Sequence, residues 1–315
     1  MILSCGDALY DVFMASKPGG GQGGLALDAR VGGSPLNVAI GLSRLGQPTG
    51  FFAKVSTDPF GQNLVGYLAA EEVDTGLCVR TDAPTTLAVV ALDAKGVPTY
   101  SFYTNGTADR SLERAELPAR LPDAIRAIHI GSYATALEPT AGSLEALVTR
   151  ENSRRFISYD PNVRPSIVPE RDLWRGRVAA LTAQAHLVKA SVEDIAFLYP
   201  GADEADILRE WLQRGVCLAV ATRGEGGALA MTRSGLVAEV KSPHVAVIDT
   251  VGAGDTFQAA LLTWLAEDGR LSPDGIASLS ERQLAALLEF AARAAAITCS
   301  RRGADMPRRA EVQPV

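Results

Sequence analysis

The sequence has 315 residues, of which 47% are hydrophobic and 21% are charged, and its formal net charge is -6. This apolar content excludes a disordered chain, and the acidic balance argues against an extended nucleic-acid-binding surface. No hydrophobic run approaches the roughly 18 residues of a membrane span, and the N-terminus lacks the cationic start of a secretory signal. We therefore expect a cytoplasmic protein with neither nucleic acid nor membrane as a partner.

Short apolar runs alternate with longer segments of helical periodicity, which is typical of an α/β protein with a mainly parallel sheet. We expect strands at residues 2–5, 50–55, 127–130, 156–159, 187–189 and 217–222. We expect helices between them, at residues 36–45, 61–72, 141–150, 173–185, 192–198, 204–214 and 254–267. No repeat or linker interrupts the chain, so residues 1–315 are expected to form one domain.

Two segments, about 8–32 and 84–106, break this alternation. The second is predicted to form a hairpin over residues 85–103, around a turn at 94–96. Because open α/β sheets bind ligands at the carboxyl ends of their strands, we expect both insertions to form a small β lid over that edge. A homodimer is one way of covering the unpaired edges of such a lid.

The segment at 249–257 (DTVGAGDTF) precedes a long apolar helix. Gly252 and Gly254 permit a tight turn whose backbone N–H groups converge, and the helix adds its positive dipole end. Asp255 lies in the first helical turn, where its carboxylate is favoured and can accept a proton. Amides that hold a phosphoryl group beside a carboxylate base suit phosphoryl transfer to a hydroxyl. The alternative interpretation is a glycine turn before a capped helix.

The segment at 32–46 (GGSPLNVAIGLSRLG) is the second motif. Its two leading glycines allow close approach to a ligand, and Asn37 offers both a donor and an acceptor near a helix start. The alternative is an ordinary loop and helix. Other phosphate-binding motifs are absent: the chain has no Walker A loop, and the GxGxxG match at 19–24 follows no apolar strand.

Together, the GG-x-P-x-N-x-A…R-L-G segment and the D-T-x-G-A-G-D segment resemble the two signatures of the PfkB (ribokinase-like) family of carbohydrate kinases. The resemblance covers essentially the whole chain. It implies a ribokinase-like α/β fold, with a central, mainly parallel sheet flanked by helices and a small β lid. It also implies an ATP-dependent kinase that transfers the γ-phosphoryl group to a primary hydroxyl of a monosaccharide, with Mg²⁺ as cofactor.

The resemblance also implies roles for individual residues. The catalytic base is Asp255, with the amides of Gly252, Ala253 and Gly254 as an anion hole. The expected sugar contacts are Asp7, Asp11, Gly33, Asn37 and Phe102, together with Asp160, Asn162 and Arg164 at the end of a predicted strand. The expected nucleotide contacts are Lys189, Asp194, Thr222, Gly224, Gly227 and Gly254, with Glu193 as the alternative to Asp194 for an acidic role associated with magnesium. A monovalent cation such as K⁺ is implied at Asp249 and the carbonyls around Val251, Cys299, Arg301 and Gly303.

Substrate specificity is expected to rest on the lid and on residues 159–165 (YDPNVRP). The D-x-N-x-R pattern is typical of the fructokinase and 2-keto-3-deoxygluconate kinase branches. Residues 100–110 resemble the fructokinase form and place no cation before Arg110 for a sugar acid, which favours fructose. The alternatives are a sugar-acid kinase, another sugar or nucleoside kinase such as a ribokinase, and a sugar- or nucleotide-binding sensor without catalysis.

Overall fold

A nine-stranded sheet forms the centre of the computed structural model, which describes residues 1–14, 24, 26–92 and 98–312. The strand order is β15-β14-β13-β12-β11-β10-β1-β4-β6. The strands from β13 to β6 run parallel, and β14 and β15 are antiparallel additions at one edge. Their bounds are β1 (Ile2–Cys5), β4 (Thr49–Phe52), β6 (Val73–Asp74), β10 (Ala127–Gly131), β11 (Phe156–Asp160), β12 (Leu187–Ser191), β13 (Leu218–Thr222), β14 (Ala228–Thr232) and β15 (Val237–Val240).

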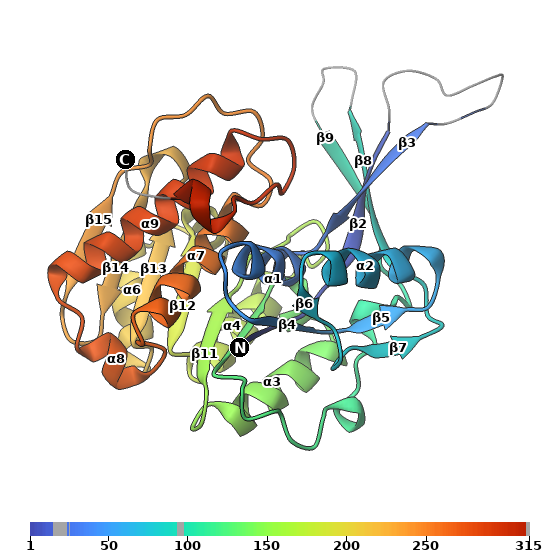
Figure 1. Cartoon of the computed structure of the whole chain (residues 1–315). Coiled ribbons are helices and arrows are strands. Elements are labelled where there is room, and N and C mark those ends of the chain that lie inside the picture. Colours follow the sequence, from blue (N-terminus) through green and yellow to red (C-terminus); the bar gives the residue numbers. More distant parts are fainter. Residues whose placement is uncertain (15–23, 25, 93–97, 313–315) are drawn as a thin grey trace.

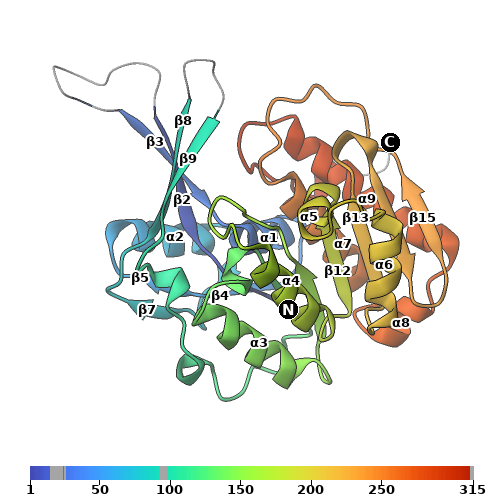
Figure 2. The same cartoon turned by 180° about the vertical axis from the view of Figure 1, so that it is seen from behind.

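Helices cover both faces of this sheet (Figure 1; Figure 2). One face carries α1 (Ser34–Arg44), α2 (Pro59–Ala70), α7 (Ala253–Glu267), α8 (Pro273–Ala277) and α9 (Glu281–Cys299). The other face carries α3 (Thr140–Glu151), α4 (Arg171–Thr182), α5 (Val192–Leu198) and α6 (Glu204–Gln213). Short 3-10 turns are η1 (Ala108–Arg110), η2 (Arg114–Glu116), η3 (Tyr133–Thr135), η4 (Gly224–Gly226) and η5 (Arg309–Val312). This arrangement confirms the predicted α/β fold with a central, mainly parallel sheet flanked by helices.

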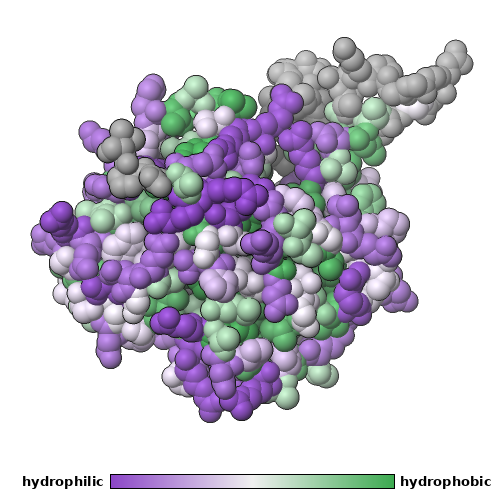
Figure 3. All heavy atoms as spheres, viewed as in Figure 1, coloured by the Kyte–Doolittle hydropathy of each residue, from purple (hydrophilic) through white to green (hydrophobic). Residues whose placement is uncertain are grey.

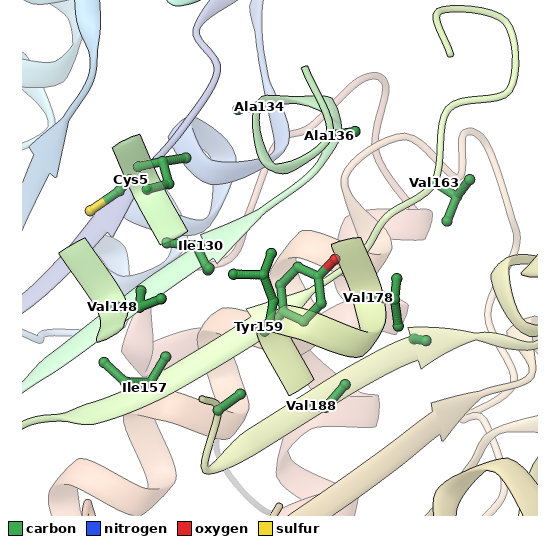
Figure 4. Close-up of a cluster of buried hydrophobic side chains, with 14 of the residues drawn as sticks. Cys5, Ile130, Ala134, Ala136, Val148, Ile157, Tyr159, Val163, Val178 and Val188 are labelled. Carbon is green, nitrogen blue, oxygen red and sulfur yellow. The ribbon is translucent and has the colours of Figure 1, made fainter. Parts of the chain in front are cut away.

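The central strands are buried on both faces, which explains their nearly continuous hydrophobic sequences. In β11, Phe156 joins the cluster under α7 and α9, whereas Ile157 and Tyr159 join the cluster under α3 to α6. Figure 4 shows Tyr159 within that second cluster, surrounded by aliphatic side chains such as Val178 and Val188. Because strand side chains alternate between faces, each strand contributes to both cores.

A separate four-stranded sheet projects from the body (Figure 1). Its order is β3-β2-β8-β9, with β2 (Leu9–Met14), β3 (Leu27–Gly32), β8 (Thr86–Leu92) and β9 (Pro98–Tyr103). These strands come from the two segments that interrupt the α/β alternation in the sequence. The hairpin turn at 94–96 and most of the glycine-rich segment at 19–24 lie outside the described residues.

The element predictions fail at the sheet margins. The single strand expected at 50–55 is two strands, β4 and β5 (Lys54–Ser56), because the chain leaves the central sheet at Ala53 and β5 pairs with β7 (Val79–Thr81). The edge strands β6, β14 and β15 and the helix α9 were not among the predicted elements. None of the helices in the described part of the chain has the length and hydrophobicity of a membrane span.

Candidate active site

The two glycine-containing motifs meet where α1 and α7 pack against each other. A Cβ atom added at Gly41 of α1 would lie 2.8 Å from the Cβ of Ala259 in α7, which is closer than two such atoms can approach. Glycine at this position therefore lets the two helix backbones come together. One turn earlier on each helix, Asn37 and Asp255 face each other.

Three side chains hydrogen-bond the carboxylate of Asp255, which is 6% exposed. Ser34 Oγ donates to Oδ1 at 2.6 Å, and Asn37 Nδ2 donates to Oδ2 at 2.8 Å. Asn162 Nδ2 lies 3.4 Å from Oδ1, a longer contact from the loop after β11. These neutral donors fix the orientation of the carboxylate, as a proton acceptor requires.

Backbone amides lie beside this carboxylate at the start of α7. Gly252 adopts a left-handed conformation with φ of 78°, and a Cβ there would lie 2.6 Å from the Cβ of Ala304. Among the described residues, no acceptor receives the N–H groups of Gly252, Gly254 and Asp255. The N–H of Ala253 donates to Thr250 O at 3.2 Å and is therefore engaged within the turn. Three amides at a helix N-terminus are available to an anion.

Two further carboxylates lie on the α1 side of Asp255. Asp7 is 1% exposed, its Oδ2 accepts the Ser34 N–H at 3.3 Å, and its Oδ1 has no hydrogen-bond partner among the described residues. Burial and the nearby Asp109 carboxylate raise the pKa of Asp7 to about 7, although the Arg164 guanidinium opposes this shift. Burial likewise raises the pKa of Asp11 to about 6 against the effect of Arg164.

The backbone around these groups leaves no room for larger residues. Gly33 has φ of 111°, and a Cβ there would lie 2.6 Å from the carbonyl oxygen of Asp7. One site is bordered by five polar side chains that contact one another or influence one another's charge: Asp7, Asp11, Asn37, Arg164 and Asp255. Short carboxylate and amide groups in this arrangement are suited to binding vicinal hydroxyls.

The family model for pfkB family carbohydrate kinases matches residues 1–310 of the chain. The chain belongs to this family of sugar phosphotransferases. It is 39% identical over 284 residues to the fructokinase of Rhizobium leguminosarum bv. trifolii. The alignment covers 90% of this chain and 85% of that protein.

Solved structures of sugar kinases have the same fold. Fructokinase with bound ATP from Xylella fastidiosa aligns with a TM-score of 0.90 and 28% identity, over 99% of this chain and 96% of that one. A double mutant of the fructokinase from Vibrio cholerae O395, in fructose, ADP and potassium ion bound form, aligns with a TM-score of 0.81 and 26% identity, over 99% and 96% of the two chains.

In this pfkB kinase, the D-x-N-x-R segment is held from two sides. Asp160 forms an ion pair with Lys189 of β12, with 2.8 Å between Oδ2 and Nζ. The Val163 N–H donates to Asp194 Oδ1 at 2.8 Å, while Asp194 Oδ2 accepts the Ser191 N–H at 3.1 Å. Between these anchors, Asn162 has a left-handed φ of 40° and turns its amide toward Asp255.

The residues expected at the nucleotide lie along the neighbouring strand ends. Thr222 ends β13 and is paired in register with Ser191 of β12. Gly224 has φ of 55°, and Gly227 has φ of 90° with no space for a Cβ, which would meet the Val240 carbonyl oxygen at 1.9 Å. Lys189, by contrast, is buried under the start of α7.

The acidic residues 193 and 194 face different surroundings. Asp194 is buried and adjoins the loop that carries Asn162, whereas exposed Glu193 lines a hollow between α5 and α6 together with Glu204. Asp194 is therefore the one that lies beside the site.

The residues expected at a monovalent cation also lie together. Asp249 Oδ1 accepts the Val251 N–H at 3.1 Å, and its Oδ2 accepts the Gly303 N–H at 2.8 Å. The carbonyl oxygen of Cys299 accepts the N–H groups of Ile248 and Asp249 at 2.8 and 3.2 Å. The Asp249 carboxylate and the Cys299 carbonyl are hard oxygen donors of the kind that a monovalent cation prefers, and in this structure each accepts backbone N–H groups.

Sequence reasoning missed two polar residues of the site and its surroundings. Ser34 lies within the first motif and binds Asp255, and its position before Pro35 at a helix start was the available signal. Asp109 is 2% exposed and accepts hydrogen bonds from Thr86, Thr107 and Tyr133 at the base of the small sheet. Phe102 lies in the same region and packs against the larger hydrophobic cluster.

Proposed function

We propose that this chain is an ATP-dependent fructokinase that transfers the γ-phosphoryl group of ATP to a primary hydroxyl of fructose. The observation that carries this proposal is Asp255, which is oriented by Ser34 and Asn37 and lies beside free amides at the start of α7. The sugar itself is supported by the relatives that bear the name fructokinase, among them the protein of Rhizobium leguminosarum bv. trifolii.

Asp255 accepts the proton of the sugar hydroxyl as its oxygen attacks the γ-phosphorus. The N–H groups of Gly252, Gly254 and Asp255 receive the negative charge that develops on the transferred group. ADP leaves on the opposite side, so the sugar gains the phosphoryl group and the carboxylate holds the proton. Mg²⁺ bound together with ATP would supply positive charge that offsets the charge of the phosphates.

The charge of the sugar side favours a neutral substrate. Asp7, Asp11 and Asp255 bring three carboxylates to the site, and Arg164 is the cation whose charge acts on Asp7 and Asp11. Since the positive charge of Arg164 is already offset by two nearby carboxylates, little of it remains for the carboxylate of a sugar acid. This balance supports fructose over 2-keto-3-deoxygluconate.

The small sheet acts as a lid in this proposal, inserted into a single kinase domain spanning 1–315. It contributes Asp11 from β2, and β3 leads through Gly33 to Ser34, which hydrogen-bonds Asp255. Closure over the sugar would exclude water and suppress hydrolysis of ATP. A homodimer formed over its open edges remains a prediction, as does a cytoplasmic location.

We propose that the nucleotide binds beside the turn after β13, which contains Thr222, Gly224 and Gly227. Large hydrophobic side chains are exposed beside the amide turn, namely Val247, Ile248 and Val251. Figure 3 shows hydrophobic residues at this upper rim, where Figure 1 draws the loop between β15 and α7. An apolar surface next to an anion site suits a base with attached phosphates. A cation such as K⁺ at Asp249 would stiffen the same loop.

A coupled assay of ADP release tests the proposal. We expect turnover with fructose, and at least a tenfold lower kcat/KM with 2-keto-3-deoxygluconate, ribose and adenosine. A preference for the sugar acid would contradict the charge argument. Failure of all four acceptors to support ADP release would contradict the kinase assignment itself.

A further inference from the structure

The ion pair between Lys189 and Asp160 has no part in the mechanism above, yet it lies in the interior. The two side chains are 4% and 1% exposed, with Nζ and Oδ2 separated by 2.8 Å. Burying two charges carries a large desolvation penalty for each ion. A hydrophobic pair of similar volume would avoid that penalty, so the pair calls for an explanation beyond stability.

The position of Lys189 relates the pair to α7. Lys189 lies on β12 two residues after Leu187, which belongs to the core cluster under α7, so both side chains point to that face. A Cβ added at Gly254 would lie 3.5 Å from Lys189 Nζ, in van der Waals contact. The ammonium group is therefore directly beneath the amide turn that is proposed to hold the phosphoryl group.

Asp160 connects the same pair to the loop that reaches the base. Its backbone carbonyl accepts the Ser132 N–H at 3.1 Å, and two residues later Asn162 extends its amide to within 3.4 Å of Asp255 Oδ1. The left-handed conformation of Asn162 requires support from its surroundings, which the Asp160 ion pair and the bond from Val163 to Asp194 provide.

The charges facing this region are coupled. Burial raises the pKa of Asp160 to about 6; the charge of Lys189 opposes this shift, and the charges of Asp194 and Asp255 reinforce it. His129 of β10 also faces Lys189, and burial lowers the pKa of His129 to about 3, so its ring is neutral. The other charged groups nearby lie on the sugar side. There, the charge of Arg164 acts on Asp7 and Asp11, and the charge of Asp255 acts on Asp11.

On the basis of the proposed function, we propose that Lys189 is a positioning residue for phosphoryl transfer and not a ligand of the nucleotide. Paired with Asp160, its ammonium group supports the amide turn and the Asn162 loop from below. Its charge also offsets the carboxylates around Asp255. The first effect acts on turnover through geometry, and the second acts on the pH at which the site is active.

The test compares Lys189→Met, Lys189→Arg and the double variant Asp160→Asn with Lys189→Met. For Lys189→Met we expect kcat to fall at least tenfold, while the Kd values for ADP and for the sugar change less than threefold. The acid limb of the kcat–pH profile should move to higher pH, because carboxylates that lose a neighbouring cation bind protons more readily. The double variant, which removes both charges, should return that limb toward its original position.

Arg155→Met is the matched control, because Arg155 forms a similarly buried ion pair with Glu151, away from the site. It should lower the melting temperature and leave the pH profile unchanged. A loss of ADP affinity of tenfold or more in Lys189→Met, with kcat unchanged, would make Lys189 a nucleotide ligand and overturn the proposal. An unmoved profile and full turnover of the folded variant would reduce the pair to a structural role. If Lys189→Met does not fold, Lys189→Arg and the double variant decide between these outcomes by the same measurements.

The wild-type protein is first assayed with the panel of acceptors. If it phosphorylates a sugar other than fructose, the variants are compared with that sugar. ADP binding needs no sugar, so a failure of the substrate assignment is distinguished from a failure of the Lys189 assignment.

Discussion

At the scale of single residues, the chemistry converges on one carboxylate held by neutral donors. Ser34 and Asn37 each donate to a different oxygen of Asp255, so the carboxylate cannot rotate without losing a hydrogen bond. Its first-turn position in α7 adds the favourable end of the helix dipole. The orientation of this carboxylate is thus fixed before substrates arrive.

Replacing this carboxylate should separate binding from turnover. We expect Asp255→Asn to lower kcat by about 10³-fold, in the range typical of a lost general base, because the amide cannot accept the hydroxyl proton. Fructose binding measured by calorimetry should change less than tenfold. Asp172→Asn serves as the control, since it removes a 97% exposed carboxylate from the first turn of α4. Near-normal turnover in Asp255→Asn would refute its assignment as the base.

Asp7 should make the ligand-free protein less stable as the pH rises. Its pKa is about 7 in the folded protein and near 3.8 in an unfolded chain, so the folded state holds the proton more tightly. Its contribution to stability is therefore lost between about pH 4 and pH 7. At pH 8, Asp7→Asn should increase the free energy of unfolding by an amount on the order of 2 kcal/mol and should therefore raise the melting temperature. It should also weaken fructose binding. The melting temperatures of the two proteins are measured from pH 4.5 to 8. An identical dependence on pH in both proteins would contradict this prediction.

At the scale of secondary-structure elements, the spacing between α1 and α7 determines the geometry of the site. Gly41 and Ala259 set how closely the helices approach, and Asn37 and Asp255 lie one turn away from that contact. A small change in helix separation therefore changes the hydrogen bond that orients the base.

Two glycine-to-alanine variants test this spacing. In Gly41→Ala the new methyl group would meet Ala259 Cβ at 2.8 Å and Met306 Sδ at 3.0 Å. We expect a loss of about 1–3 kcal/mol in stability and a lower kcat, as in other overpacked interiors. Gly66 of α2 has no atom within 4 Å of an added Cβ, so Gly66→Ala should gain about 0.5–1 kcal/mol with unchanged kcat. Chemical denaturation and steady-state kinetics measure both, and equal effects in the two variants would contradict the prediction.

Most body elements could be predicted from the sequence, because strands such as β11 and β13 are buried on both faces and consist of hydrophobic residues. Edge strands gave a weaker signal: β15 alternates between exposed and half-buried residues. The break at Ala53 depends on which strand β5 pairs with, and that is a tertiary contact.

The site was predictable where a motif is local in the sequence, as at 32–46 and 249–255. It was not predictable where function depends on register between strands. The pairing of Asp160 with Lys189 requires β11 and β12 to be neighbours. Asp109 accepts hydrogen bonds from Thr86 and Tyr133, which are 23 and 24 residues away in the sequence. No local pattern contains this information.

At the scale of the whole molecule, the small sheet is connected to the body by buried polar contacts at its base. Asp109 accepts hydrogen bonds from Thr86 Oγ1 at 2.5 Å, at the start of β8, and from Tyr133 in the turn after β10. It thereby links the sheet to the body. Asp109 also lies near Asp7 of the proposed sugar site, since its charge helps to raise the pKa of Asp7.

Asp109→Asn should loosen this connection. An amide accepts through one oxygen only, and its NH₂ group would face hydroxyl donors that now meet a carboxylate. We expect the KM for fructose to rise about tenfold and ATP hydrolysis without sugar to increase relative to sugar phosphorylation. Parallel assays of ADP and sugar phosphate measure this ratio. A variant with a normal KM and no uncoupled ATP hydrolysis would show that the hydrogen bonds of Asp109 do not hold the small sheet in its working position.

The contact between α1 and α7 also determines when the site can form during synthesis. Asn37 and Asp255 are 218 residues apart, so the base has its partner only after more than three quarters of the chain has been made. Until then the face of α1 that contains Gly41 has no α7 packed on it. A ribosome-bound chain that ends before α7 lacks the proposed base, so catalytic activity requires synthesis past residue 255.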